Sequence, residues 1–159
     1  MNSPQTFISI FKVNSALFVN AFKDVDDATA SKRSNEKTNS MIFLALHSVD
    51  SRYYILNLLG SKAKNPYAEE YKDVRMIEDV KKYPPLEELL KIWKKTDRLL
   101  SKKLSELKPK QLKSKTDFKF PFVDKTLHGT ISFLAAHESY HIGQLGLIRK
   151  YLGFPSVSF

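Results

Sequence analysis

The most informative part of the chain is the stretch HESYHIGQ, residues 137–144. It contains His-Glu-x-x-His, in which two histidines one helical turn apart can hold Zn²⁺ and the glutamate can act as a base, as in zinc proteases. Such proteases normally take a third ligand from further along the chain. After His141 this chain has no Asp, Glu or His. We therefore do not expect a protease, and any third ligand must come from an earlier segment.

Four segments have apolar residues at helical spacing, and no segment alternates convincingly like a strand. We predict helices over residues 4–22, 39–59 and 85–107, and a last helix that begins between residues 126 and 131 and ends near residue 152. Ser3 suits the cap of the first helix, and Gly60 and Gly153 suit helix ends. The fold class is therefore all-α, a four-helix bundle with long connections between helices 1 and 2, 2 and 3, and 3 and 4. The second of these connections is long enough to run the length of a helix, so the second and third helices can be parallel neighbours.

Length and composition point to one ordinary globular domain over residues 1–159. The chain has no cysteine, which excludes disulfides, thiolate metal sites and a cysteine nucleophile, and which fits a cytoplasmic location. No apolar stretch approaches the ~20 residues of a membrane span, so we expect no membrane association. The net charge is +9. Because the lysines are widely spread, we interpret the charge as a solvated surface and do not expect nucleic-acid binding.

Two earlier histidines could complete a metal site. His128 lies nine residues before His137, about half a turn out of phase if both are on one helix, so we do not expect it to be a ligand. His47 lies in the middle of the most apolar segment, where a buried imidazole needs a partner. Metal sites in bundles are built from side chains on facing helices. His47 is therefore either a third ligand to the metal or a histidine packed in the core.

Two stretches resemble the DinB/YfiT-like superfamily: LALHSVDSRYYILNLLG, residues 44–60, and HESYHIGQLGLIRKYLG, residues 137–153. The resemblance covers nearly the whole chain. Many members carry a tryptophan one turn before the first histidine, where this chain has Phe43, a difference that concerns pocket shape. The resemblance implies a bundle in which His47, His137 and His141 bind a divalent metal, usually zinc or nickel. It also implies a metal-dependent hydrolase or a thiol S-transferase, and a homodimer.

Side chains near these histidines are candidates for supporting roles. On the last helix, Glu138 could be a catalytic base or a salt-bridge partner at the rim, and Gln144 could orient a ligand or a bound water or bond to another helix. On the second helix, Asp50 could hold an imidazole N–H, and Ser51 and Tyr54 could form pocket walls.

Two further expectations concern residues outside this set. Arg52 points away from the ligand side of its helix, and we expect it to form a surface or interface salt bridge. Three aromatic residues before the last helix could form a lid over one end of the bundle: Phe118, Phe120 and Phe122.

From these observations we expect a metal-dependent enzyme that acts on a small molecule. If the reaction uses a thiol, a low-molecular-weight thiol must arrive as a cosubstrate, because the chain has no cysteine. The alternative is a non-enzymatic basic bundle that binds nucleic acid or a protein partner, with histidines that only support the fold.

Overall fold

The computed structural model describes residues 4–118 and 124–158, and every structural statement below concerns these residues. Four long helices dominate it: α1 (Pro4–Ala21), α3 (Met41–Leu58), α4 (Leu86–Ser105) and α5 (Leu127–Tyr151). A short helix, α2 (Asp27–Ala30), and two 3₁₀ turns, η1 (Ile77–Asp79) and η2 (Gln111–Lys113), lie in the connections. Since no strand occurs in the described part of the chain, the all-α prediction is confirmed.

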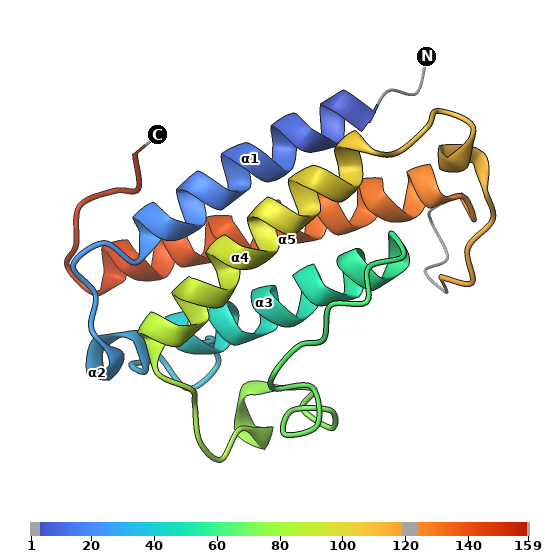
Figure 1. The fold of residues 1–159 in the computed structure, drawn as a ribbon. Helices are drawn as coiled ribbons and strands as arrows, with labels where there is room; N and C mark the ends of the chain where they lie inside the picture. Colours follow the sequence, from blue (N-terminus) through green and yellow to red (C-terminus); the bar gives the residue numbers. More distant parts are fainter. Residues whose placement is uncertain (1–3, 119–123, 159) are drawn as a thin grey trace.

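The four long helices form a ring in which α1 and α3 each pack against both α4 and α5. Figure 1 shows that α1 and α5 run in one direction and α3 and α4 in the other. The helices α3 and α4 are therefore parallel neighbours, and the connection over residues 59–85 returns the chain along the whole bundle. No helix among the described residues is both long enough and apolar enough to span a membrane.

The ends of the helices follow from local chemistry. The side chains of Ser40 and Thr126 cap α3 and α5, because each accepts a hydrogen bond from a backbone N–H three residues on. Gly60 and Gly153 follow the ends of the same helices with φ of 73° and 87°, the left-handed region that glycine adopts readily. The predicted helix bounds are thus close to those observed, whereas α2 was not predicted. The cap predicted from Ser3 lies outside the described residues.

The interior combines apolar packing with one buried ion pair. Arg52 on α3 has no exposed surface, and its Nε and Nη2 donate to the two carboxylate oxygens of Glu138 on α5. Nη2 also donates to Ser15 Oγ at 2.9 Å, and the guanidinium lies 4.0 Å from the ring centroid of Trp93. The expectation of a surface or interface salt bridge for Arg52 is wrong. The side of α3 that faces away from His47 is the core of the bundle.

We predict that Glu138→Ala lowers the free energy of unfolding by about 3 kcal/mol, because the buried Arg52 loses the carboxylate that both its Nε and Nη2 bond and keeps only Asp97, at 3.5 Å from Nη1, as an acidic partner. Urea unfolding followed by circular dichroism measures this change. The double variant Arg52→Met/Glu138→Leu should recover most of the loss, since it removes both charges and keeps the volume filled.

The matched control is Glu87→Ala, which removes the partner of the exposed Lys91 on α4. We expect a cost below about 1 kcal/mol there, as for other exposed pairs. Equal losses in Glu138→Ala and Glu87→Ala would show that the buried pair does not hold α3 against α5.

Candidate metal centre

Three histidines converge where α3 packs against α5. His47 comes from the middle of α3, and His137 and His141 come from successive turns of α5. The Nε2 atoms of His137 and His141 lie 3.0 Å apart, and one ring nitrogen from each of the three residues falls within 4.8 Å of the others. The ring of His47 meets the other two rings edge-on, at centroid distances of 5.3 Å and 4.7 Å.

Gln144 fixes the proton position on His141. Its Oε1 lies 2.7 Å from His141 Nδ1, and because an amide oxygen can only accept, Nδ1 carries the proton. The amide nitrogen of Gln144 donates to the hydroxyl of Tyr140 at 3.3 Å, which keeps the oxygen turned toward the imidazole. The Nε2 of a neutral His141 therefore presents a lone pair toward the other two histidines.

The surroundings keep all three imidazoles uncharged at neutral pH. Burial, with a smaller contribution from His141 and His137, lowers the pKa of His47 to about 4. Burial also lowers the pKa of His137 and of His141, and for His141 the hydrogen bond to Gln144 partly offsets the effect. A metal binds the neutral form of histidine, so no proton has to be removed for binding at pH 7.

Aromatic side chains wall the cluster. Phe43 stacks on His47 at 6.4 Å, and Phe133 stacks on His137 at 5.9 Å. Phe118 touches Phe133 and also Tyr54, whose side chain is 46% exposed. Tyr54 therefore lies at the outer end of a row of aromatic side chains that leads to His137. Phe120 and Phe122 of the predicted lid lie outside the described residues.

The connection between α3 and α4 supplies the other wall. A pocket of about 40 Å³ beside His47 is lined by Phe43, Leu46, His47, Asp50, Asn65, Tyr71, Val74 and Arg75. Four of these residues, from Asn65 onward, were not singled out in the sequence. The length of this connection is typical of a functional segment, but which of its residues face α3 is decided only in the folded structure.

The remaining candidate residues have other contacts. The carboxylate of Asp50 accepts a hydrogen bond from Asn65 Nδ2 at 2.8 Å instead of holding an imidazole. Ser51 is half-buried, and within residues 4–118 and 124–158 no hydrogen bond joins it to a histidine. His128 packs against Phe7, away from the cluster, in line with the expectation that it is not a ligand.

Glu138 lies in the core and not against the histidines. Both its oxygens accept hydrogen bonds from Arg52, and the side chain is buried. Position i+1 on a helix is turned by about 100° from the first histidine, and on α5 that direction leads into the bundle. The geometry therefore gives no support to a catalytic base at Glu138.

The three histidines fit a divalent ion. Zinc–nitrogen bonds of about 2.0–2.1 Å in tetrahedral geometry place ligand nitrogens ~3.3 Å apart. The observed 3.0 Å between two of the nitrogens, and the upper limit of 4.8 Å for the set, require only small side-chain movements. Three nitrogen ligands leave at least one position for water or a substrate.

Comparisons with known proteins support the same fold. The sequence model of the DinB superfamily matches residues 10–145, a range that includes all three histidines. The crystal structure of a conserved protein from Enterococcus faecalis is similar at a TM-score of 0.74 and 16% identity, covering 96% of this chain and 98% of that one. At this identity the likeness shows the fold alone. A comparison with curated proteins gives no match. Because the family model matches most of the chain, from α1 into α5, the protein belongs to the DinB superfamily.

Proposed function

We propose that this DinB-superfamily protein binds one divalent metal ion through His47, His137 and His141 and is a metal-dependent enzyme. The observation that carries the proposal is the convergence of three neutral imidazoles from two helices, with ligand nitrogens within 4.8 Å of one another. A site made only of imidazole nitrogens suits zinc or nickel better than calcium or magnesium, which prefer oxygen ligands.

The ion would supply Lewis acidity and would lower the pKa of a water or thiol that binds beside the histidines. Hydrolysis and thiol S-transfer are the two reactions that this chemistry serves. In the second case the thiol comes from a cosubstrate, since the chain has no cysteine.

The chain's own residues would orient the ligands and select the substrate. Gln144 holds His141 in the tautomer that binds metal, and Phe43 and Phe133 keep the rings of their histidines in place. The pocket beside His47 is narrow, but it shares Asp50 and Asn65 with an open groove of about 810 Å³ along α3 and the following connection. These dimensions favour a small molecule that lies in the groove and reaches the histidines at one end.

We predict that tag-free protein, stripped with a chelator and then reloaded, retains about one equivalent of zinc or nickel by elemental analysis. His47→Ala removes one of three ligands and should lose most of the bound metal. His128→Ala is the matched control, because this histidine lies outside the cluster, and it should bind as wild type does.

Loaded wild type should then show ester or amide hydrolysis, or thiol transfer to an electrophile with a small added thiol, that His47→Ala lacks. A wild-type protein that takes up no divalent ion would rule out the metal site. A loaded protein that is inactive in both assays would leave metal binding intact and count against the enzyme.

Gln144→Ala should weaken zinc affinity by about 10–100-fold, because His141 loses the partner that fixes its tautomer. Competition with a chromophoric chelator measures the affinity. Gln144→Glu keeps an acceptor oxygen at the same place and should stay within a few-fold of wild type. If both variants behaved alike, the hydrogen bond to His141 would not be the cause.

The stability of the metal-free protein should fall as the pH is lowered from about 6.5 to about 4. In this window unfolded His47 takes up a proton at its ordinary pKa, whereas folded His47 stays neutral down to about 4. The unfolded state thus binds more protons, so the free energy of unfolding rises with pH. Urea unfolding at a series of pH values should give a shallower slope between pH 5 and 6.5 for His47→Gln, and identical slopes would contradict the prediction.

A further inference from the structure

A groove between α1 and α4 lies on the side of the bundle opposite the histidines, which sit between α3 and α5. Its volume is about 380 Å³. It is lined by Lys12, Ser15, Ala16, Val19, Asn20, Trp93, Lys94, Asp97 and Arg98. Ala16 and Val19 give it a small apolar floor, and a volume of this size is within the range of about 300–1,000 Å³ seen for small-molecule sites.

The cations of this groove lack acidic partners. Lys12 is the one charged residue of α1 and lies in the lining. On α4, Lys91 pairs with Glu87 at 2.8 Å, and Lys102 lies 4.0 Å from Glu106.

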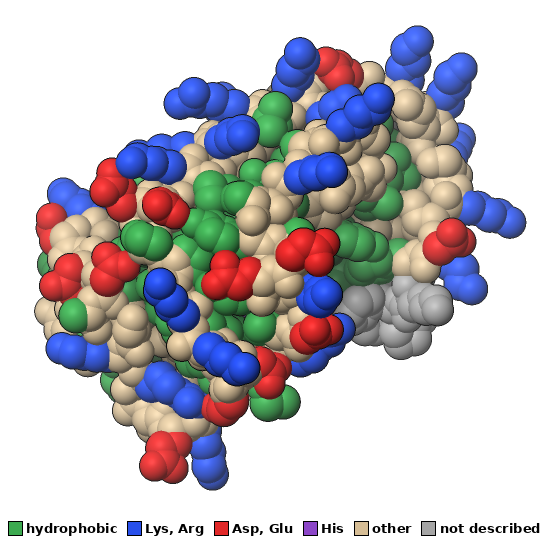
Figure 2. Space-filling model, turned by 60° about the horizontal axis from the view of Figure 1, so that its bottom comes forward, with side chains coloured by type: hydrophobic (Ala, Val, Ile, Leu, Met, Phe, Trp, Pro, Cys, Tyr) green, Lys and Arg blue, Asp and Glu red, His purple; other side chains and the backbone are tan. Residues whose placement is uncertain are grey.

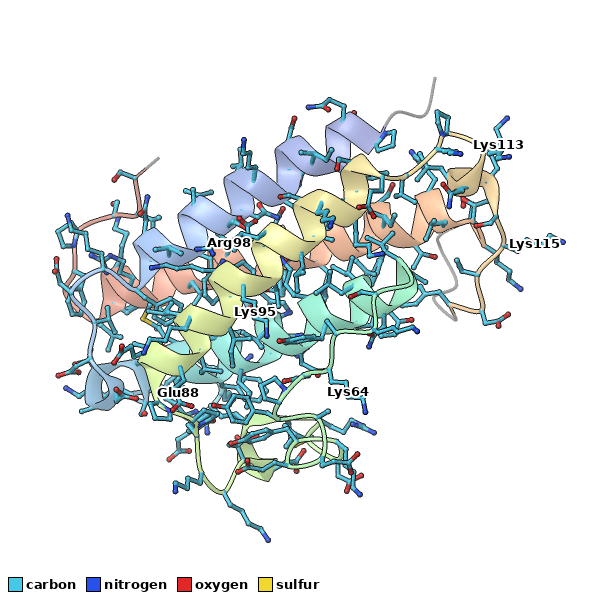
Figure 3. The ribbon with its side chains drawn as sticks, in the orientation of Figure 1. Lys64, Glu88, Lys95, Arg98, Lys113 and Lys115 are labelled. Atoms are coloured by element: carbon cyan, nitrogen blue, oxygen red, sulfur yellow. The ribbon has the colours of Figure 1, made fainter. Side chains whose placement is uncertain are left out.

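Between these paired positions, Lys94, Lys95 and Arg98 have no ion pair with any described residue. Figure 3 places Lys95 and Arg98 on neighbouring turns of α4, and in Figure 2 the Lys and Arg side chains gather in the upper part of the view, with few Asp or Glu among them.

The one acid in the lining is engaged from within. Asp97 accepts a hydrogen bond from Ser15 Oγ at 2.5 Å and lies 3.5 Å from Nη1 of the buried Arg52. Because the Arg52 charge is already paired with Glu138, Asp97 still contributes one negative charge to the lining. Against this one acid stand the three cations Lys12, Lys94 and Arg98, so the groove keeps a surplus of positive charge.

This arrangement costs stability without a ligand. Lys94 and Arg98 are four residues apart on α4, and Lys95 and Arg98 are three apart, spacings at which like charges destabilise a helix. A multivalent anion in the groove would turn this repulsion into charge-assisted hydrogen bonds, with the guanidinium of Arg98 suited to bind two oxygens of a phosphate at once.

We propose that this groove binds a small molecule that carries two or more phosphate charges, at a site separate from the three histidines. Three lining cations around a short groove match a compact phosphate group better than a nucleic-acid backbone, which needs a longer track of contacts. The proposal does not depend on metal binding.

The test is a calorimetric titration of the full-length, metal-free protein with inorganic triphosphate in a chelator-containing buffer, at about 50 mM and then 150 mM salt. We expect one saturable site, weakened at the higher salt. Lys94→Gln/Arg98→Gln should weaken binding at least tenfold. Both side chains are exposed, so the variant should fold, which circular dichroism checks.

The control variant Lys113→Gln/Lys115→Gln removes the same charge at the far end of the bundle, in the connection between α4 and α5 (Figure 3). It should change the affinity by less than twofold. Equal losses in the two variants, or no saturation in wild type, would mean nonspecific attraction and would overturn the proposal. Equally tight binding of citrate would overturn the assignment to phosphate. Tighter binding of a 20-nucleotide single strand, lost in the same variant, would assign the groove to nucleic acid instead.

Discussion

The ion pair between Arg52 and Glu138 sets the relation between α3 and α5, and the histidine cluster depends on that relation. Arg52 follows His47 by five residues on α3, and Glu138 follows His137 directly on α5. The two helices therefore meet in one register that closes the ion pair inside the bundle and the histidine cluster at its edge. A slip of either helix by one turn would part the guanidinium from its carboxylate, which is expensive inside a core, and would separate the imidazoles as well.

Much of the fold could be predicted from the sequence because it depends on local patterns. Apolar spacing located the four long helices, and glycines at residues 60 and 153 marked two of their ends. The length of the connection over residues 59–85 also allowed the parallel arrangement of α3 and α4 that is observed. The short helix α2 was missed because its four residues carry too little periodicity to stand out. The histidine pair on α5 follows from helical spacing. The assignment of His47 as the third ligand came from the resemblance of the sequence to a known family.

The expectations for Arg52 and Asp50 failed for one reason. A helical wheel gives the direction of each side chain around the helix axis but not which residues lie in that direction. Arg52 was correctly placed away from the ligand side of α3, yet that side is the core, where its partner lies 86 residues further along the chain. Asp50 was expected to hold an imidazole N–H, yet its carboxylate accepts a hydrogen bond from Asn65 of the following connection. In both cases the partner lies on a segment whose register no local pattern specifies.

The surroundings of the helix also decide what the glutamate of His-Glu-x-x-His contacts, here as in a zinc protease. Helix geometry fixes the angle of the glutamate relative to the two histidines, so what matters is which sector of the helix is buried. On α5 the sector of Glu138 is buried against Arg52, and the sector of His137 and His141 opens at the edge of the bundle beside His47. Both oxygens of that carboxylate accept hydrogen bonds from Arg52 and are turned away from the histidines. The glutamate thus belongs to the folding of this bundle, and the proposed chemistry rests on three neutral imidazoles and the ion they would hold.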